Sequence, residues 1–276
     1  ASATSPLTHN AENVETLLFM FEKGIPTPYI AAPMIGATAP VTLAGAVALG
    51  TADNLVGLVL SQIVNPGCPF LGSNFVDMMD MQTTSFAMTA PELPLAEAAS
   101  ADIYRWLGIP SVCHMGMTDA CEFDQQAAMD VTAHLYTSML SGANLNFFSG
   151  FLETAMSGSL EVLYFANDVV GYLDHIIGGI EINEETLALD VIDEVGPEGN
   201  FLGEEHTLEH YRENWRPGTL ARQNWNTYTE NGSRDYKARA NEAVKEILNR
   251  GVQRPLPPET LKRLDGIMEN AREKLR

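Results

Sequence analysis

Positive charge is scarce in this sequence of 276 residues. Lys and Arg together number 16 against 36 Asp and Glu, which gives a formal net charge of −20. Nucleic acids and anionic lipid surfaces are bound through clusters of basic side chains. We therefore expect no nucleic-acid partner and no membrane contact of the polybasic kind.

Cysteine and long apolar runs are also scarce. The three cysteines, at positions 68, 113 and 121, are odd in number and lack the CxxC spacing of structural zinc sites. We expect no metal site and a reducing, cytoplasmic location. No run approaches 18 uninterrupted apolar residues, so we expect no transmembrane helix. Apolar residues still make up 45% of the chain, which is enough for a sizeable core.

The sequence does contain a repeating unit, in which an amphipathic helix ends at a glycine and a short apolar run follows. The unit occurs four times, with its glycine stops at Gly24, Gly67, Gly108 and Gly142. Glycine ends helices because it adopts a left-handed conformation without strain. The apolar runs that follow are typical of parallel strands covered by helices.

Regular αβ units predict either an open doubly wound sheet or a (β/α)8 TIM barrel. No GxGxxG or GxxxxGK[ST] motif follows any expected strand, so we favour the barrel. Residues 4–7 would end one more strand, giving about five strands where a closed barrel has eight. We thus expect residues 1–178 to be the C-terminal part of a TIM barrel. Residues 179–276 would be a helical C-terminal extension packing on it, whose charged helices (234–249 and 258–275) would allow a homo-oligomer.

Active sites of TIM barrels lie where strands end and the following loops begin. This rule selects His114, Asp119 and Glu153 as candidate catalytic residues. The candidate substrate-binding residues are Gly36, Asn74, Gly116, Asn146, Phe147 and Phe148. Several have a structural alternative: His114 as a hydrogen-bonded histidine of the barrel, the two acids as turn carboxylates, Gly36 as a site of close helix packing, and the Phe residues as core. Adjacent strand residues point to opposite faces, so only one of Phe147 and Phe148 should face the lumen.

Several stretches resemble the trimethylamine methyltransferase family, which includes enzymes without pyrrolysine that act on quaternary amines such as glycine betaine. The matching stretches are GATAPVTLAGAVAL (36–49), TDACEFDQQA (118–127), GFLETAMSGSLEVL (150–163) and IEINEETLALDVIDEVGPEGNFLGEEHTLEH (180–210). The resemblance covers nearly the whole chain. The family's proteins are at least half as long again, so this sequence resembles their C-terminal part.

The resemblance implies a TIM barrel that transfers an N-methyl group to the Co(I) of a corrinoid. The corrinoid belongs to a cognate partner protein, and this chain itself would bind no cofactor tightly. Gly116 stands where trimethylamine enzymes carry pyrrolysine, which favours a small quaternary amine as substrate. Two alternatives stay open from the residues: a lyase-type TIM-barrel enzyme that uses His114 and Glu153 as acid and base, and a non-catalytic remnant of the family.

Overall fold

The computed structural model describes residues 1–275, in which five extended segments lie side by side in chain order. Residues 27–35, with β1 (Thr27–Pro28) and β2 (Met34–Ile35), pair in parallel with residues 70–78, with β3 (Phe70–Leu71) and β4 (Asp77–Met78). On one side Ser2 pairs with Ile30, and on the other Gly72 pairs with Ser111. There β5 (Val112–His114) pairs in parallel with β6 (Leu145–Phe147).

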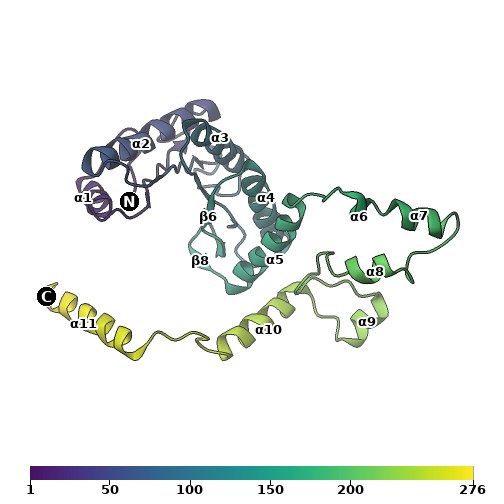
Figure 1. Cartoon of the computed structure of the whole chain (residues 1–276). Helices are drawn as coiled ribbons and strands as arrows, with labels where there is room; N and C mark the ends of the chain where they lie inside the picture. Colours follow the sequence, from purple (N-terminus) through teal and green to yellow (C-terminus); the bar gives the residue numbers. More distant parts are fainter. Residues whose placement is uncertain (276) are drawn as a thin grey trace.

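Five helices cover one side of these segments. They are α1 (Ala11–Glu22), α2 (Leu43–Val64), α3 (Glu92–Leu107), α4 (Gln125–Ser141) and α5 (Leu160–Ile177). Each packs against the next, so that they follow an arc with the strands on its inner side (Figure 1). Gly108 and Gly142 end α3 and α4 in the left-handed conformation, and Gly24 and Gly67 also have positive φ. The predicted stops at Gly24, Gly108 and Gly142 are confirmed, whereas α2 already ends at Asn65, two residues before Gly67.

The structure confirms an α/β fold, with strands paired in chain order as in a singly wound barrel. A doubly wound sheet reverses its strand order partway, and these segments do not. The arc does not close within residues 1–275. One feature the sequence did not predict is an antiparallel hairpin after the fifth segment, formed by β7 (Phe151–Leu152) and β8 (Ser157–Gly158).

By length and composition alone α2 is long and apolar enough to cross a membrane, a test that the core helix of a soluble protein also passes, so the absence of a transmembrane helix stays a prediction. That expectation counted uninterrupted apolar runs, and polar residues interrupt this helix. Two of them, Asp53 and Asn54, are fully buried. The Asn54 amide donates to the carbonyl oxygens of Tyr29 and Ser73, so the helix uses its polar side chains to hold two strand segments. This bonding is typical of a helix packed on a sheet.

The rest of the described chain consists of helices joined by loops. It contains α6 (Glu184–Leu187), α7 (Leu189–Val195), α8 (Glu205–His210), α9 (Trp225–Glu230), α10 (Tyr236–Asn249) and α11 (Pro258–Lys274). Only α10 among them has buried residues, and it packs on α5 (Figure 1). Tyr236 donates to Asp168 at 2.8 Å, and Asn241 donates to Glu161 at 2.6 Å. These bonds anchor the extension to the arc.

Candidate functional site

The two faces of the strand arc differ in chemistry. Along residues 70–78, Gly72 and Asn74 face the helices, because Gly72 lies against the Tyr104 ring and Asn74 donates to α2 and α3. Side chains alternate along a strand, so Ser73, Phe75 and Asp77 face the inner side of the arc. His114 is on the same inner face, because its ring contacts Phe75 and its Nε2 lies 3.5 Å from the Ser73 hydroxyl.

His114 lies at the centre of an aromatic cluster, which we define as Phe75, His114, Phe147, Phe148 and Phe151. Its ring centroid is 4.5 Å from that of Phe75, 4.4 Å from Phe147 and 5.6 Å from Phe148. Only 1% of the residue is exposed. The structure therefore brings together three predicted site residues, His114, Phe147 and Phe148, where the strands end.

The expectation that only one of Phe147 and Phe148 faces inward is wrong. Both rings contact His114, and their own centroids are 4.9 Å apart. Phe148 has φ of 80°, which ends the strand and turns its side chain out of the alternating pattern. Sequence alternation fails here because it assumes that extended backbone continues through residue 148.

Glu97 of α3 is a site residue that the sequence analysis missed. Its Oε1 lies 3.1 Å from His114 Nδ1, and its Oε2 accepts from the His114 backbone amide at 3.2 Å. It is 1% exposed. A signal was present: Leu93, Glu97 and Tyr104 share one helix face at spacings of four and seven residues, so an acid stands on an otherwise buried stripe.

Asp77 is the second missed residue. The apolar run after Gly67 that indicates this strand ends near Asn74, whereas the extended backbone continues through β4. Asp77 is 8% exposed and its Oδ1 has no hydrogen-bond partner among the described residues. Burial, with a further contribution from the charge of Glu97, raises the pKa of the Asp77 carboxyl to about 8.

Two predicted substrate-binding residues point away from the inner face. The Asn74 amide donates to the Val47 carbonyl at 3.1 Å and to the Ser100 hydroxyl at 3.2 Å, between α2 and α3. Asn146 accepts a hydrogen bond from Ser138 of α4. Both are positioned to tie strands to helices, so the structure does not bring them to the aromatic cluster.

The two acids predicted from loops differ in their surroundings. Asp119 accepts hydrogen bonds from the backbone amides of Met88 and Thr89 at 3.1 and 2.9 Å. It also accepts from the Thr89 and Thr154 hydroxyls at 2.7 and 3.0 Å, so it joins three loops. Glu153 is exposed, with φ of 51°, in the turn of the β7–β8 hairpin. A catalytic role for either remains a prediction.

The two predicted glycine positions have left-handed backbone, in which any side chain is strained. At Gly36 a Cβ would lie 2.7 Å from the Met81 sulfur, with φ of 82°. At Gly116 φ is 100°, and a Cβ would lie 2.4 Å from the Ser149 hydroxyl oxygen. That hydroxyl is held by the Met115 carbonyl at 3.0 Å. A larger residue at position 116 would therefore require Ser149 and its loop to move.

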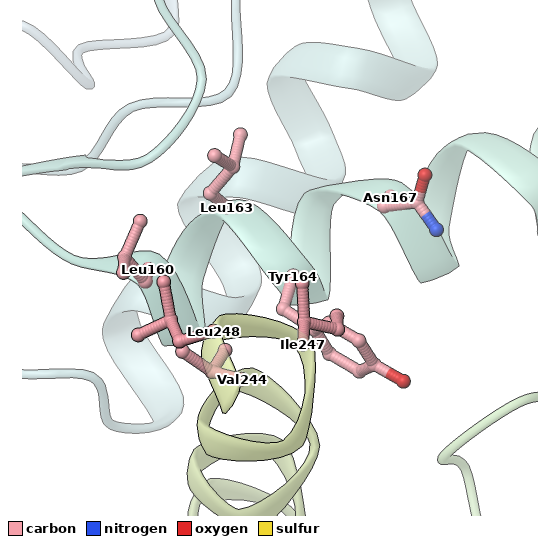
Figure 2. Close-up of a pocket in the computed structure, with 7 residues that line it drawn as sticks. All are labelled: Leu160, Leu163, Tyr164, Asn167, Val244, Ile247 and Leu248. Atoms are coloured by element: carbon pink, nitrogen blue, oxygen red, sulfur yellow. The ribbon is translucent and has the colours of Figure 1, made fainter. Parts of the chain in front are cut away.

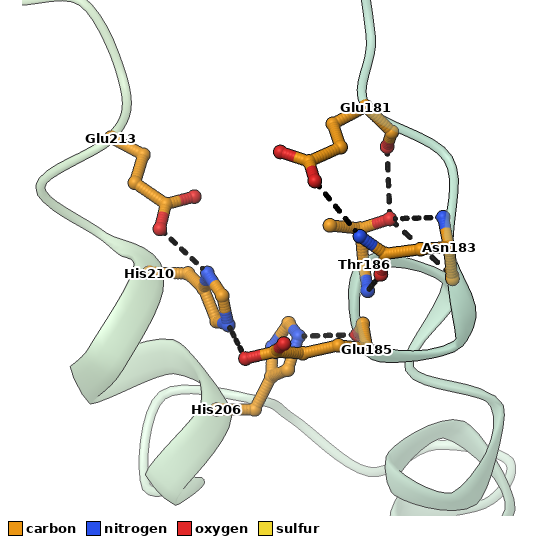
Figure 3. A network of polar contacts seen from close by, with 7 residues as sticks. All are labelled: Glu181, Asn183, Glu185, Thr186, His206, His210 and Glu213. Carbon is orange, nitrogen blue, oxygen red and sulfur yellow. Dashed lines mark hydrogen bonds and ion pairs between the residues drawn. The ribbon is translucent and has the colours of Figure 1, made fainter.

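Two other concave or polar regions involve the extension. An apolar groove of about 240 Å³ runs between α5 and α10, lined mainly by leucine and isoleucine side chains (Figure 2). Farther along, His210 Nδ1 lies 2.8 Å from Glu213, and His206 Nε2 lies 3.3 Å from the Glu185 carbonyl (Figure 3). Neither region contributes a side chain to the aromatic cluster.

Metal-ligand chemistry is not evident in the part of the chain that the structure describes. Residues 1–275 contain no group of three or more His, Cys, Asp or Glu side chains arranged to hold a metal ion. Burial raises the pKa of the Cys113 thiol far above its ordinary value, and the charge of Glu97 raises it further. Because metals bind the thiolate, this thiol is a poor ligand at neutral pH.

Comparisons with known proteins identify one family. The family model described as trimethylamine methyltransferase (MTTB) matches residues 1–275. A trimethylamine methyltransferase MttB of Desulfitobacterium hafniense (strain DSM 10664 / DCB-2) is 31% identical over 98% of this chain and 54% of its own length. A glycine betaine methyltransferase of D. hafniense (strain Y51) is 31% identical over 94% of this chain and 54% of its own length. The chain spans about half the length of these relatives.

Proposed function

The chain belongs to the trimethylamine methyltransferase family, and from that premise we propose that it is part of a methylated-amine methyltransferase. The donor would be a quaternary amine resembling glycine betaine, and the acceptor the Co(I) of a corrinoid carried by a cognate partner protein. Support comes from the names of the relatives, which include both a trimethylamine and a glycine betaine methyltransferase.

The fold proposal is that residues 1–178 form the C-terminal part of an eight-stranded barrel. Five parallel segments in chain order, with helices on one side only, match that architecture. The aromatic cluster would then lie at the C-terminal mouth of the barrel, where TIM-barrel active sites are found. Residues 179–276 would be the helical extension, held to α5 through α10.

Gly116 is the observation that favours a quaternary amine. The family resemblance places pyrrolysine of the trimethylamine enzymes at this position. Here the backbone has φ of 100°, and a Cβ would meet Ser149 at 2.4 Å. A site without pyrrolysine lacks the side chain that would hold a neutral amine in the trimethylamine enzymes. A quaternary amine carries its own permanent charge and can be held by aromatic faces and carboxylates instead.

The corrinoid would supply Co(I), a strong nucleophile that takes the methyl group as the C–N bond breaks. The bonding electrons of the C–N bond leave with the nitrogen, so a quaternary donor yields a neutral tertiary amine and needs no proton. The task of this chain is therefore to bind the donor, orient its methyl group and exclude water. We assign substrate contact to His114, Phe147 and Phe148. Glu97 and Asp119 would be positioning residues, and Glu153 a carboxylate of the mouth.

The partner would dock at the same end of the strands, because the methyl group must reach its cobalt. The loop after β4 suits a docking surface: Met79 is half-buried, and Met81 is 58% exposed. Methionine side chains adapt to a partner's surface because they are unbranched and flexible. The proposed location of the system is the cytoplasm, and the charged helices α10 and α11 would allow a homo-oligomer.

The test is spectroscopic loss of cob(I)alamin in the presence of the complete gene product and one candidate donor at a time. Glycine betaine, carnitine and trimethylamine form the panel. We expect conversion to methyl-Co(III) with a quaternary amine and none with trimethylamine. Turnover of trimethylamine would contradict the inference from Gly116. His114→Ala should retain measurable turnover at saturating donor, and complete loss would contradict a mechanism of positioning alone.

A further inference from the structure

The strand arc has almost no positive charge of its own. Residues 1–178 contain 17 Asp and Glu but only two basic residues, Lys23 and Arg105. Both are exposed at helix ends, and Arg105 pairs with Asp102. None of the five extended segments contains Lys or Arg. A buried carboxylate on the inner face therefore has no basic side chain of these segments to neutralise it.

Two buried acids nevertheless lie at this face. Asp77 is on the inner side of its strand, one same-face position beyond Phe75, and its Oδ1 is buried without a hydrogen bond among the described residues. Glu97 is close enough for its charge to act on Asp77, and its own oxygens are directed at His114. Buried carboxylates are costly unless they are paired. The part of the chain that the structure describes supplies a partner for Glu97 but none for Asp77.

We propose that Asp77, with Glu97 beside it, is the anionic contact for the quaternary ammonium head of the substrate, which lies against the aromatic cluster. This inference rests on the proposed function and refines it, because it names the group that neutralises the substrate's charge. A quaternary ammonium donates no hydrogen bond and is held by carboxylates and aromatic faces. A metal ion is the poorer fit, because the described residues offer no three-ligand set.

The direct test compares choline with its neutral carbon isostere, 3,3-dimethylbutan-1-ol, by calorimetric titration of the complete gene product. The two probes share a shape and differ in charge. At pH 8.5 we expect Asp77→Asn to weaken choline binding at least tenfold and to leave the isostere unchanged. Asp265→Asn, the same substitution on exposed α11, is the matched control and should bind choline as the wild type does.

The pH dependence of binding supplies a second readout. The charged group that acts on Asp77 is Glu97 from α3, which itself contacts His114 of β5, and the paired β2 contains no titratable side chain. Because choline requires the ionised carboxylate, its affinity should fall by up to tenfold per unit as the pH is lowered from about 8 to 6. Asp77→Asn should remove that slope. Phe75→Leu keeps the carboxyl and should weaken choline severalfold while preserving the slope.

The outcomes separate this inference from the proposed function. Equal choline affinity in wild type and Asp77→Asn would overturn the inference, as would wild-type protein that binds no choline. Methyl transfer by the wild type is measured independently with cob(I)alamin. Asp77-dependent choline binding without any transfer would uphold the cation site and refute the proposed reaction. Circular dichroism and melting of each variant show that a loss of binding is not a loss of fold.

Discussion

Asp77 should make the folded protein less stable as the pH rises, and Asp77→Asn should remove this effect. The carboxyl has an ordinary pKa of 3.8 when the chain is unfolded and about 8 when it is buried beside Glu97. Between those two values the unfolded chain releases its proton while the folded chain retains it. Stability is therefore lost as the pH rises from about 4 to about 8, by roughly 1.4 kcal/mol per unit. The whole shift corresponds to a loss on the order of 5 kcal/mol.

The assay is urea unfolding followed by circular dichroism at pH 5, 6, 7 and 8, with Asp265→Asn as the exposed control. Effects of titratable groups that do not interact with Asp77 cancel in the difference between variant and wild type. Asn cannot ionise, so the variant should exceed the wild type by several kcal/mol at pH 8. This difference in unfolding free energy should disappear toward pH 4. Parallel plots of unfolding free energy against pH for the two proteins would refute the inference that the Asp77 carboxyl is buried and unpaired. A variant that is less stable than the wild type at pH 8 would refute it as well.

Three further substitutions test the surroundings of the site. Glu97→Ala leaves two buried donors of His114 unsatisfied and should cost about 3–5 kcal/mol of unfolding free energy, whereas Glu97→Gln keeps one acceptor and should cost about 1–2 kcal/mol. Equal costs would contradict the paired geometry. Asp119→Ala removes the acceptor of four hydrogen bonds and should cost about 2–4 kcal/mol, with faster amide exchange at residues 88 and 89 as its local signature. Gly116→Ala at φ of 100° should cost about 2 kcal/mol in urea unfolding, and an unchanged midpoint would show that the loop gives way freely.

Local signals in the sequence predicted where several of the helices begin and end. Glycine stops at Gly108 and Gly142 marked helix ends, because a left-handed terminal residue is a local backbone requirement. The start of α6 is set just as locally, since the Asn183 side chain accepts a hydrogen bond from a backbone amide three residues away. The break between α6 and α7 at Ala188, which has φ of 48°, has no such local signal, because neither glycine nor proline occurs between residues 184 and 195.

The site was predicted in part. His114 and the two Phe residues were selected because strand ends lie together in a barrel, and the structure groups their rings. Asn74 and Asn146 satisfied the same rule but face the helices. The rule locates the end of a strand and is silent about which face a side chain occupies. A shift of one residue in the strand reverses that face.

The sequence by itself determined the α/β pattern, the glycine stops, the acidic charge and the family, because each is written in local spacing or in contiguous stretches. Only the tertiary structure decided which acids matter at the inner face. Glu97 and Asp77 are 20 residues apart, on a helix and a strand, and neither has a distinguishing motif. Their burial and mutual influence arise only when α3 packs on its strands, because desolvation and charge coupling depend on distance through space and not along the chain.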